Sequence, residues 1–282
     1  MIMTDICIVY VNYYHRDDID RSLASIERDR KDTYDVHVLV IDNSLDADNV
    51  KDMLSKKYPY VQYVMPERNL GFAGGNNRGF AACDARYYFC LNGDTEFIEG
   101  TNTLARIIDF MDRHSKVGMI APKLIGMDGI RQNSCYRFDF GSIFVKPLRQ
   151  LGWHGSFERF TVWSKRLQME DFGQDRTQPI DWALGAALVA RREAIEDVGY
   201  MDERYFLYLE DCDWCRTFWE YGWPVYFVHD IVIKHRHDRA SSRVPGLIRA
   251  LLCNTQARIH VISWCKYLRK WGWKHRYFGR VK

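Results

Sequence analysis

The stretch ICIVYVNYYHRDDIDRSLASIERDRKDTYDVHVLVIDNS, residues 6–44, decides the fold class. It begins with an apolar run typical of a buried strand and closes with a second run rich in β-branched residues. Between the two runs, Ile19, Leu23 and Ile26 recur at helical spacing and give an intervening helix one apolar face. A strand, a helix and a strand in this order predict a mostly parallel sheet with right-handed crossovers and flanking helices.

The same alternation continues along the chain. Further strands are expected near residues 60–65, 85–94, 117–122, 180–191 (interrupted at Gly185), 224–228 and 230–238, and further helices near 46–58, 102–113, 192–199 and 210–221. Residues 69–80 predict a Gly/Asn-rich turn followed by a short helix. In sheets of this kind ligands bind at the carboxyl ends of the strands. Asp42, the glycine-rich turn and Asp94 all fall at such ends.

Charge is distributed unevenly along the 282 residues, although the net charge is only +3. Of the 40 Lys and Arg residues 11 follow Asp238, where there is no Asp or Glu, so residues 1–238 carry a net charge of −8. With 47% hydrophobic and 27% charged residues, the chain can bury a sizeable core. We therefore expect one α/β domain over 1–245 and a basic, aromatic helical tail over 246–282.

The segments that would indicate export or membrane insertion are missing from the sequence pattern. No stretch approaches the roughly 20 uncharged apolar residues of a membrane-spanning helix, and the first residues, MIMTDICIVYVNYYHRDD, lack the basic lead and cleavage site of a signal peptide. The eight cysteines are scattered, which is typical of reduced thiols. These features predict a cytoplasmic protein.

The glycine-rich segment NLGFAGGNNRGF, Asn69–Phe80, has four glycines in nine positions. Glycine lets a backbone approach a ligand closely or adopt a positive φ. The spacing of the glycines in this segment matches neither a dinucleotide-binding loop nor a phosphate-binding P-loop. The segment is therefore interpreted either as the wall of a ligand pocket or as a tight turn from strand to helix.

Candidate metal ligands occur in two segments. In CLNGDTEF, Asn92 and Asp94 follow a buried strand, where a carboxylate can hold a divalent cation and the cation a diphosphate, or can simply close an Asx turn. In IKHRHDRASS, His235 and His237 share one face of a strand and are either ligands or ordinary surface or core histidines. A zinc site built from these histidines and the Cys-x-x-Cys pair at residues 212 and 215 is disfavoured, because no second Cys-x-x-Cys supports it.

Glu210, Asp211 and Asp213 lie together in YFLYLEDCDWCRTFWEYGW, residues 205–223. Acidic residues in the first turn of a helix are stabilised by its dipole and its free N–H groups. That explanation covers one or two carboxylates well and three among aromatic residues less well. The pattern favours a general base whose pKa is set by its neighbours.

The tail alternates basic residues with Trp and Tyr, which suits contact with an anionic membrane surface. The apolar residues that fit one helical face of the tail are Ile248, Leu252, Ile259 and Ile262. The alternative is a helix packed on the core with a solvated basic end. Nothing else in the sequence supports nucleic-acid binding.

These motifs, taken in order, resemble the family 2 inverting glycosyltransferases of the GT-A fold. Within that family the chain looks most like the rhamnosyltransferase-type enzymes of bacterial surface polysaccharide synthesis. The resemblance covers roughly residues 5–245 and rests on VYVNYYHRDDIDRSLASI, VLVIDNS, NLGFAGGNNRGF, LNGDTEF, the stretch from DWALG to YGW, and VIKHRHDRASS. It implies a Rossmann-like GT-A domain.

The resemblance also implies a role for each matching residue. Asp211 corresponds to the general base, and Glu210 and Asp213 would either orient the acceptor or hold the start of the helix. Asp94 and His235, with His237 as the alternative, would hold Mn²⁺ or Mg²⁺, and Asn92 replaces the first acid of the family's Asp-x-Asp motif. The expected nucleotide-sugar site contains Asn12, Asp42 (reading the base), Asn69, Gly71, Phe72, Gly74, Asn76, Asn77 and Asn92, and the expected acceptor wall contains Trp182 and Gly185.

The implied activity is inverting transfer of one sugar from a nucleoside-diphosphate donor to a lipid-linked or growing surface glycan, at the cytoplasmic face of the membrane. Rhamnose from a dTDP donor is the first choice, and another sugar from a UDP donor is the alternative. A non-catalytic nucleotide- or glycan-binding scaffold is a rival interpretation that Asn92 favours. A nucleotidyltransferase would need a basic phosphate-binding motif near the N-terminus, which the sequence lacks.

Overall fold

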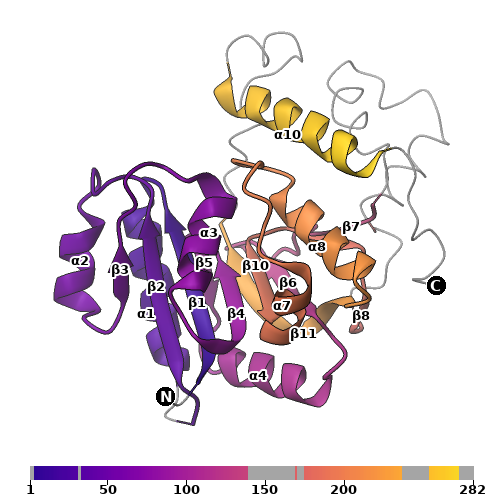
Figure 1. Cartoon of the computed structure of the whole chain (residues 1–282). Helices are drawn as coiled ribbons and strands as arrows, with labels where there is room; N and C mark the ends of the chain where they lie inside the picture. Colours follow the sequence, from indigo (N-terminus) through magenta and orange to yellow (C-terminus); the bar gives the residue numbers. More distant parts are fainter. Residues whose placement is uncertain (1–2, 31–32, 139–168, 170–174, 237–253, 273–282) are drawn as a thin grey trace.

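The structure is a computed structural model that describes residues 3–30, 33–138, 169, 175–236 and 254–272. Most of the described strands form one sheet in the order β3-β2-β1-β4-β10-β6-β11-β5, with β8 beside β11 (Figure 1). The strands of this sheet are β1 Thr4–Asn12, β2 Val36–Asp42, β3 Gln62–Val64, β4 Ala85–Leu91, β5 Thr95–Phe97, β6 Met119–Ile125, β8 Gln178–Pro179, β10 Ala187–Arg191 and β11 Val225–His235. A separate small ladder joins β7 Cys135–Tyr136 to β9 Trp182–Ala183.

The parallel part of the sheet runs through β3, β2, β1 and β4 and recurs between β6 and β11. Strand β10 runs antiparallel to both of its neighbours, β4 and β6, and joins the two parallel parts. The register of β1 with β2 pairs Asn12 with Asp42. The expected α/β fold is confirmed, and it places these two polar residues side by side at the carboxyl edge.

Helices cover both faces of the sheet, because successive strand residues point to opposite sides. In β1, Ile6, Ile8 and Tyr10 pack with α1 Arg16–Asp29, α2 Val50–Lys57 and α4 Thr103–Arg113. Cys7 and Val9 pack on the other face with α3 Gly71–Ala81, α7 Arg192–Val198 and α8 Glu210–Glu220. Burial on both faces explains why β1 reads as an unbroken apolar run.

The glycine-rich segment is a helix over nearly its whole length, whereas the sequence predicted a turn with a short helix after it. Helix α3 begins at Gly71, where φ is +73°. A Cβ on Gly79 would lie 2.3 Å from a methyl carbon of Val9, and one on Gly75 would lie 2.8 Å from both methyl carbons of Val11. These two glycines therefore let α3 pack directly on β1.

The strand that ends at His235 also differs from the expectation of two short strands. Residues 225–235 form one strand, β11, whose pairing with β6 shifts register between Val228 and Val232. The bulge absorbs the polar residues that interrupt the sequence pattern. Beyond it, β11 pairs with β5 and sets His235 opposite Thr95, the residue after Asp94.

The tail forms helix α10, Thr255–Trp271, whose first turn is capped by the side chain of Asn254. Figure 1 shows α10 in yellow beyond α8, at the end of the molecule away from the N-terminus. The helix packs through Ser263 and Tyr267, while the predicted apolar residue Ile262 is 53% exposed. Ile248 and Leu252, the other end of the predicted face, lie outside the described residues.

The described residues bear on two expectations from the sequence, one about membrane-spanning helices and one about the state of the cysteines. No helix within them is both long enough and apolar enough to cross a bilayer. The cysteines they include, all except Cys253, are free thiols.

Candidate functional site

A hydrogen-bonded pair closes the carboxyl ends of β1 and β2. The Asn12 amide donates to Asp42 Oδ1 at 2.9 Å and to Asp48 Oδ2 at 3.1 Å. Asp42 also accepts from the hydroxyls of Ser44, at 2.5 Å, and Tyr63, at 2.9 Å. Burial alone would raise the pKa of Asp42, but these hydrogen bonds outweigh burial and lower the pKa. Asp42 is thus an ionised, fully bonded carboxylate that fixes the loop after β2.

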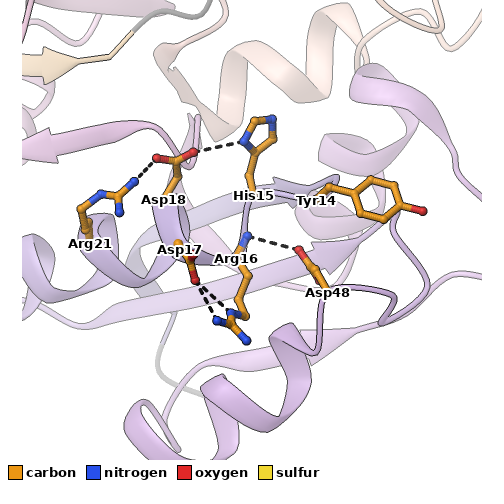
Figure 2. Close-up of a pocket in the computed structure, with 7 residues that line it drawn as sticks. All are labelled: Tyr14, His15, Arg16, Asp17, Asp18, Arg21 and Asp48. Atoms are coloured by element: carbon orange, nitrogen blue, oxygen red, sulfur yellow. Dashed lines mark hydrogen bonds and ion pairs between the residues drawn. The ribbon is translucent and has the colours of Figure 1, made fainter.

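A hollow of about 470 Å³ opens beside this pair at the start of α1 (Figure 2). Its lining comprises Tyr14, His15, Arg16, Asp17, Asp18, Arg21 and Asp48. Asp48 accepts the Arg16 backbone N–H at 3.2 Å, and His15 Nδ1 lies 3.1 Å from Asp18 Oδ2. One wall of the hollow therefore contains both positively and negatively charged side chains, and the other contains the Asp48 carboxylate. This arrangement suits a polar, charged ligand.

Asp94 and His235 face each other at the carboxyl edge, with 3.4 Å between Asp94 Oδ1 and His235 Nε2. The other ring nitrogen, Nδ1, lies 2.8 Å from Gln132 Oε1, and the Gln132 amide donates to the His235 carbonyl at 2.5 Å. This bonding assigns a proton to Nδ1 and turns Nε2 toward the carboxylate. Burial would raise the pKa of Asp94, but His235 lowers it.

A carboxylate and an imidazole nitrogen that face each other fit a divalent cation. Among the described residues no group of three or more His, Cys, Asp or Glu side chains could hold a metal. A cation bound by Asp94 and His235 would therefore need water or substrate phosphate to complete its shell, as Mg²⁺ commonly does. His237, the alternative ligand, lies outside the described residues.

Asp211 is held at the start of α8 by two backbone N–H groups. Its Oδ2 accepts from Gly185 at 2.9 Å, and its Oδ1 accepts from Cys212 at 2.7 Å. A Cβ on Gly185 would lie 3.1 Å from the Phe72 ring and 3.4 Å from Asp211 Cβ, so Gly185 leaves room for both. Removal from water raises the pKa of Asp211, although the backbone hydrogen bonds oppose the rise. Asp211 is thus a positioned carboxylate that holds a proton more strongly than an ordinary Asp.

Two buried oxygens close to Asp211 have no hydrogen-bond partner among the described residues. They are Oε2 of Glu210 and Oδ1 of Asn76. The thiol of Cys90 adjoins both residues, since burial and the charges of Glu210 and Asp211 raise its pKa while a hydrogen bond with Asn76 lowers it. Burial, followed by the charge of Asp211, raises the pKa of Glu210 well above its usual range. Unsatisfied buried oxygens are costly, so this corner suits a ligand that carries hydroxyl groups.

Other predicted site residues make bonds within the protein. Asn69 accepts the Gly71 backbone N–H at 2.8 Å, and a Cβ on Gly74 would lie 3.0 Å from Leu70 Cβ. Asn77 exchanges two hydrogen bonds, of 2.8 and 3.0 Å, with the backbone of Met201.

On the predicted acceptor side, Trp182 stacks on Tyr136 at 4.5 Å between ring centroids. Its indole N–H donates to the Arg137 carbonyl at 3.1 Å. Asp213, which the sequence grouped with Asp211, bonds instead to residues of α10.

The structure thus brings together some of the predicted residues and adds others. Phe72, Gly185 and Asp211 are in contact, as are Asn12 with Asp42 and Asp94 with His235. The residues that the sequence did not indicate are Tyr63, Gln132, Lys270 and Trp271. Gln132 lies within residues 131–180, whose sequence shows no periodic pattern. Lys270 and Trp271 were interpreted as part of the surface of the tail.

The chain matches known proteins in sequence. The family model of glycosyl transferase family 2 matches residues 5–172. The N-acetylglucosaminyl-diphospho-decaprenol L-rhamnosyltransferase of Mycobacterium tuberculosis is 27% identical over 260 residues, which are 86% of this chain and 80% of that protein.

The fold is also similar to those of solved structures. The crystal structure of GalNAc-T7 with UDP, GalNAc and Mn²⁺ has a TM-score of 0.61 at 12% identity; the match covers 89% of this chain and about half, 48%, of that one. The mannosyltransferase PcManGT from Pyrobaculum calidifontis, in complex with GDP-Man and Mn²⁺, has a TM-score of 0.54 at 13% identity. The match covers 96% of this chain and 72% of that one. These similarities establish the GT-A fold.

Glu210→Gln is expected to stabilise the protein increasingly as pH rises from 5 to 8. The pKa of Glu210 is raised in the folded state, so its contribution is present below the unfolded value of about 4.3 and is lost as pH rises through the folded value. The amide has no proton to lose, so the difference in the free energy of unfolding between variant and wild type should widen toward pH 8. Urea unfolding at both pH values measures it.

The control is Glu193→Gln, the same chemical change on an exposed position of α7. This variant should keep the pH dependence of the wild type. A Glu210→Gln difference that narrows between pH 5 and 8 would contradict the assigned direction of the pKa shift.

Proposed function

This chain belongs to glycosyl transferase family 2, and from this premise we propose that it transfers one sugar from a nucleoside diphosphate with inversion at the anomeric carbon. The observation that carries the proposal is Asp211, a partly exposed carboxylate aimed by the Gly185 N–H and made more basic by burial. Inversion requires a base on the sugar face opposite the leaving diphosphate, and Asp211 takes that role.

Asp211 accepts the proton of the acceptor hydroxyl while the hydroxyl oxygen bonds to the anomeric carbon. The bond from that carbon to the diphosphate oxygen breaks, and its electron pair leaves with the nucleoside diphosphate. A pKa raised toward neutrality suits a base that must be ionised before the reaction and protonated after it.

The nucleotide would lie at the carboxyl ends of β1 and β2, where Asn12 and Asp42 fix the loop that carries Asp48. Asp94 and His235 would hold a divalent cation, Mn²⁺ or Mg²⁺, beside Asn92. Such a cation supplies positive charge that offsets the charge on the diphosphate. The fit of Asp94 and His235 supports this assignment, as do the Mn²⁺ ions of the two similar structures.

We assign the donor sugar as rhamnose, carried by dTDP, and the acceptor as a lipid-linked or growing surface glycan. The mycobacterial relative, whose name specifies an L-rhamnosyltransferase and a diphospho-decaprenol acceptor, supports both assignments. A UDP-sugar is the alternative donor. A non-catalytic scaffold is the rival function, favoured only by Asn92 at the first position of the metal motif.

We also assign contact with the cytoplasmic face of a membrane to α10. Its face away from the core contains Arg258, Val261, Ile262, Cys265 and Arg269, all exposed. Apolar side chains flanked by arginines suit an anionic lipid surface, where a lipid-linked acceptor would reside.

Asp211→Asn should lower the rate of sugar transfer by at least about 10³-fold, because the amide cannot accept the proton. Binding of the nucleoside diphosphate should stay within about twofold of wild type, since Asp211 does not touch the proposed nucleotide site. Release of nucleoside diphosphate from the donor measures the rate, and titration calorimetry measures binding. Asp52→Asn, the same change on an exposed position of α2, is the control. Transfer at a near wild-type rate would remove Asp211 as the base.

A panel of dTDP, UDP, GDP and CMP, each with and without Mn²⁺, tests the donor site through the melting temperature. A ligand that binds only the folded state raises this temperature by mass action. We expect a metal-dependent rise with dTDP or UDP that His235→Ala abolishes and that His229→Ala, on the same strand, retains. A rise independent of metal, without turnover of the donor, would favour the scaffold.

The double variant Val261→Glu and Ile262→Glu tests the membrane assignment. It removes two exposed apolar side chains and adds negative charge, so binding to anionic liposomes should weaken at least about tenfold. Ile130→Glu, a change at another exposed isoleucine, is the control. Liposome co-sedimentation at two salt concentrations measures the effect, and unchanged binding would refute the contact.

A further inference from the structure

The carboxylate of Asp213, two residues after Asp211, is held mainly by the C-terminal helix. Lys270 Nζ lies 2.6 Å from Asp213 Oδ2, and the Trp271 indole N–H donates to Asp213 Oδ1 at 2.6 Å. Tyr205 donates to the same oxygen at 3.2 Å. Asp213 is only 1% exposed, so this charge is fully removed from water and depends on these donors.

The next turn of α8 is also fixed by α10. Arg216 is 2% exposed, and its guanidinium lies 4.5 Å from the centre of the Trp271 ring. It donates to the Tyr267 hydroxyl at 3.1 Å. Trp271 therefore contacts both Asp213 and Arg216, which sit three residues apart on one side of α8. Contacts on two successive turns restrict both the position and the rotation of the helix.

The segment that leads into α8 is fixed from two sides. Tyr208 and Leu209 have φ of 69° and 70°, a left-handed conformation that costs such residues energy and persists only when the surroundings impose it. On one side Ser263 of α10 donates to the Leu207 carbonyl at 2.8 Å. On the other side the N–H of Phe72, in α3, donates to the Phe206 carbonyl at 2.8 Å.

We propose that α10 is a positioning element of the transferase, in which Lys270 and Trp271 act through Asp213 to set the direction of the Asp211 carboxylate. This inference rests on the proposed role of Asp211 as the base. It gives Asp213 a positioning role in place of direct contact with the acceptor. Figure 1 shows the geometry that this requires, with α10 lying over α8.

Lys270 also supplies charge. Burial raises the pKa of Asp213, and the contact with Lys270 opposes the rise, as does the Trp271 hydrogen bond. The negative charges of Asp211 and Asp213 in turn contribute to the raised pKa of Glu210. The other titratable or charged groups that act on these carboxylates are Asp202, Arg204, Tyr205, Cys90 and Cys212. Removing the Lys270 cation should therefore make the carboxylates hold their protons to higher pH.

The test compares Lys270→Met, Trp271→Phe and Lys270→Arg in the full chain. Release of nucleoside diphosphate is followed with the donor whose nucleotide gives the largest metal-dependent rise in melting temperature. We expect kcat to fall between roughly tenfold and a hundredfold in Lys270→Met and Trp271→Phe, the scale on which a misplaced catalytic group acts. The donor KM should change by less than about twofold, because the nucleotide site is untouched.

The pH profile separates this role from a general loss of structure. In Lys270→Met the acidic limb of the pH profile of kcat/KM should move to higher pH. Lys270→Arg, which keeps the positive charge, should retain the position of the wild-type limb and most of the wild-type kcat. Lys56→Met, the same chemical change at an exposed lysine of α2, should leave kcat and the pH profile unchanged. Unchanged kcat and pH profile in Lys270→Met and Trp271→Phe would overturn the inference. So would a loss of kcat in which donor KM rises in proportion.

Failure of the proposed function is recognised separately. A wild-type chain that binds nucleotide without turning over any donor would remove the catalytic role of Asp211. Hydrogen exchange of the α8 amides in Lys270→Met then decides whether α10 fixes α8. Faster exchange than in Lys56→Met supports that part of the inference, and equal exchange overturns it.

Discussion

The close packing of α3 on β1 is the constraint on which the rest of the site depends. Gly75 and Gly79 leave no side chain between the helix and the strand, so α3 lies directly against Val9 and Val11. That placement brings Phe72 to Gly185 and Asp211. It also offers the Phe72 N–H to the segment before α8. One helix-to-strand contact therefore sets the distance between the donor side of the sheet and the carboxylate assigned as base.

The three carboxylates near the start of α8 differ in their hydrogen bonds and in their pKa, because their neighbours differ. Asp213 is surrounded by donors from α10 and the preceding segment. Among the described residues, Asp211 receives only backbone N–H groups, and Glu210 keeps one oxygen without a partner. Full ionisation of all three so close together would be costly. The raised pKa of Glu210 reduces this repulsion, because the carboxyl group that holds its proton more strongly adds less negative charge beside Asp211.

The strands and most helices were predictable because burial of the sheet on both faces requires apolar residues at regular positions in the sequence. The family resemblance, the fold class and the assignment as a glycosyltransferase are confirmed by the family match and the similar structures. The first part of helix α3 was predicted as a turn because glycine usually breaks helices, whereas here Gly75 and Gly79 allow close packing on β1. Gln132 and Lys270 act through contacts more than 50 residues away along the chain, which no local pattern reveals. The roles of the individual site residues remain predictions.

The two proposals for α10 concern opposite faces of one helix. Tyr267 and Trp271 face α8, while Val261 and Ile262 point away from the core. A helix held by an ion pair to a buried carboxylate and by aromatic contacts transmits displacement along its length, because close-packed contacts do not deform gradually. Contact of the outer face with a lipid surface would therefore bear on the rotation of α8 and on the aim of Asp211. In the arrangement that we propose, the helix assigned to the lipid surface is also the helix that orients the carboxylate assigned as base.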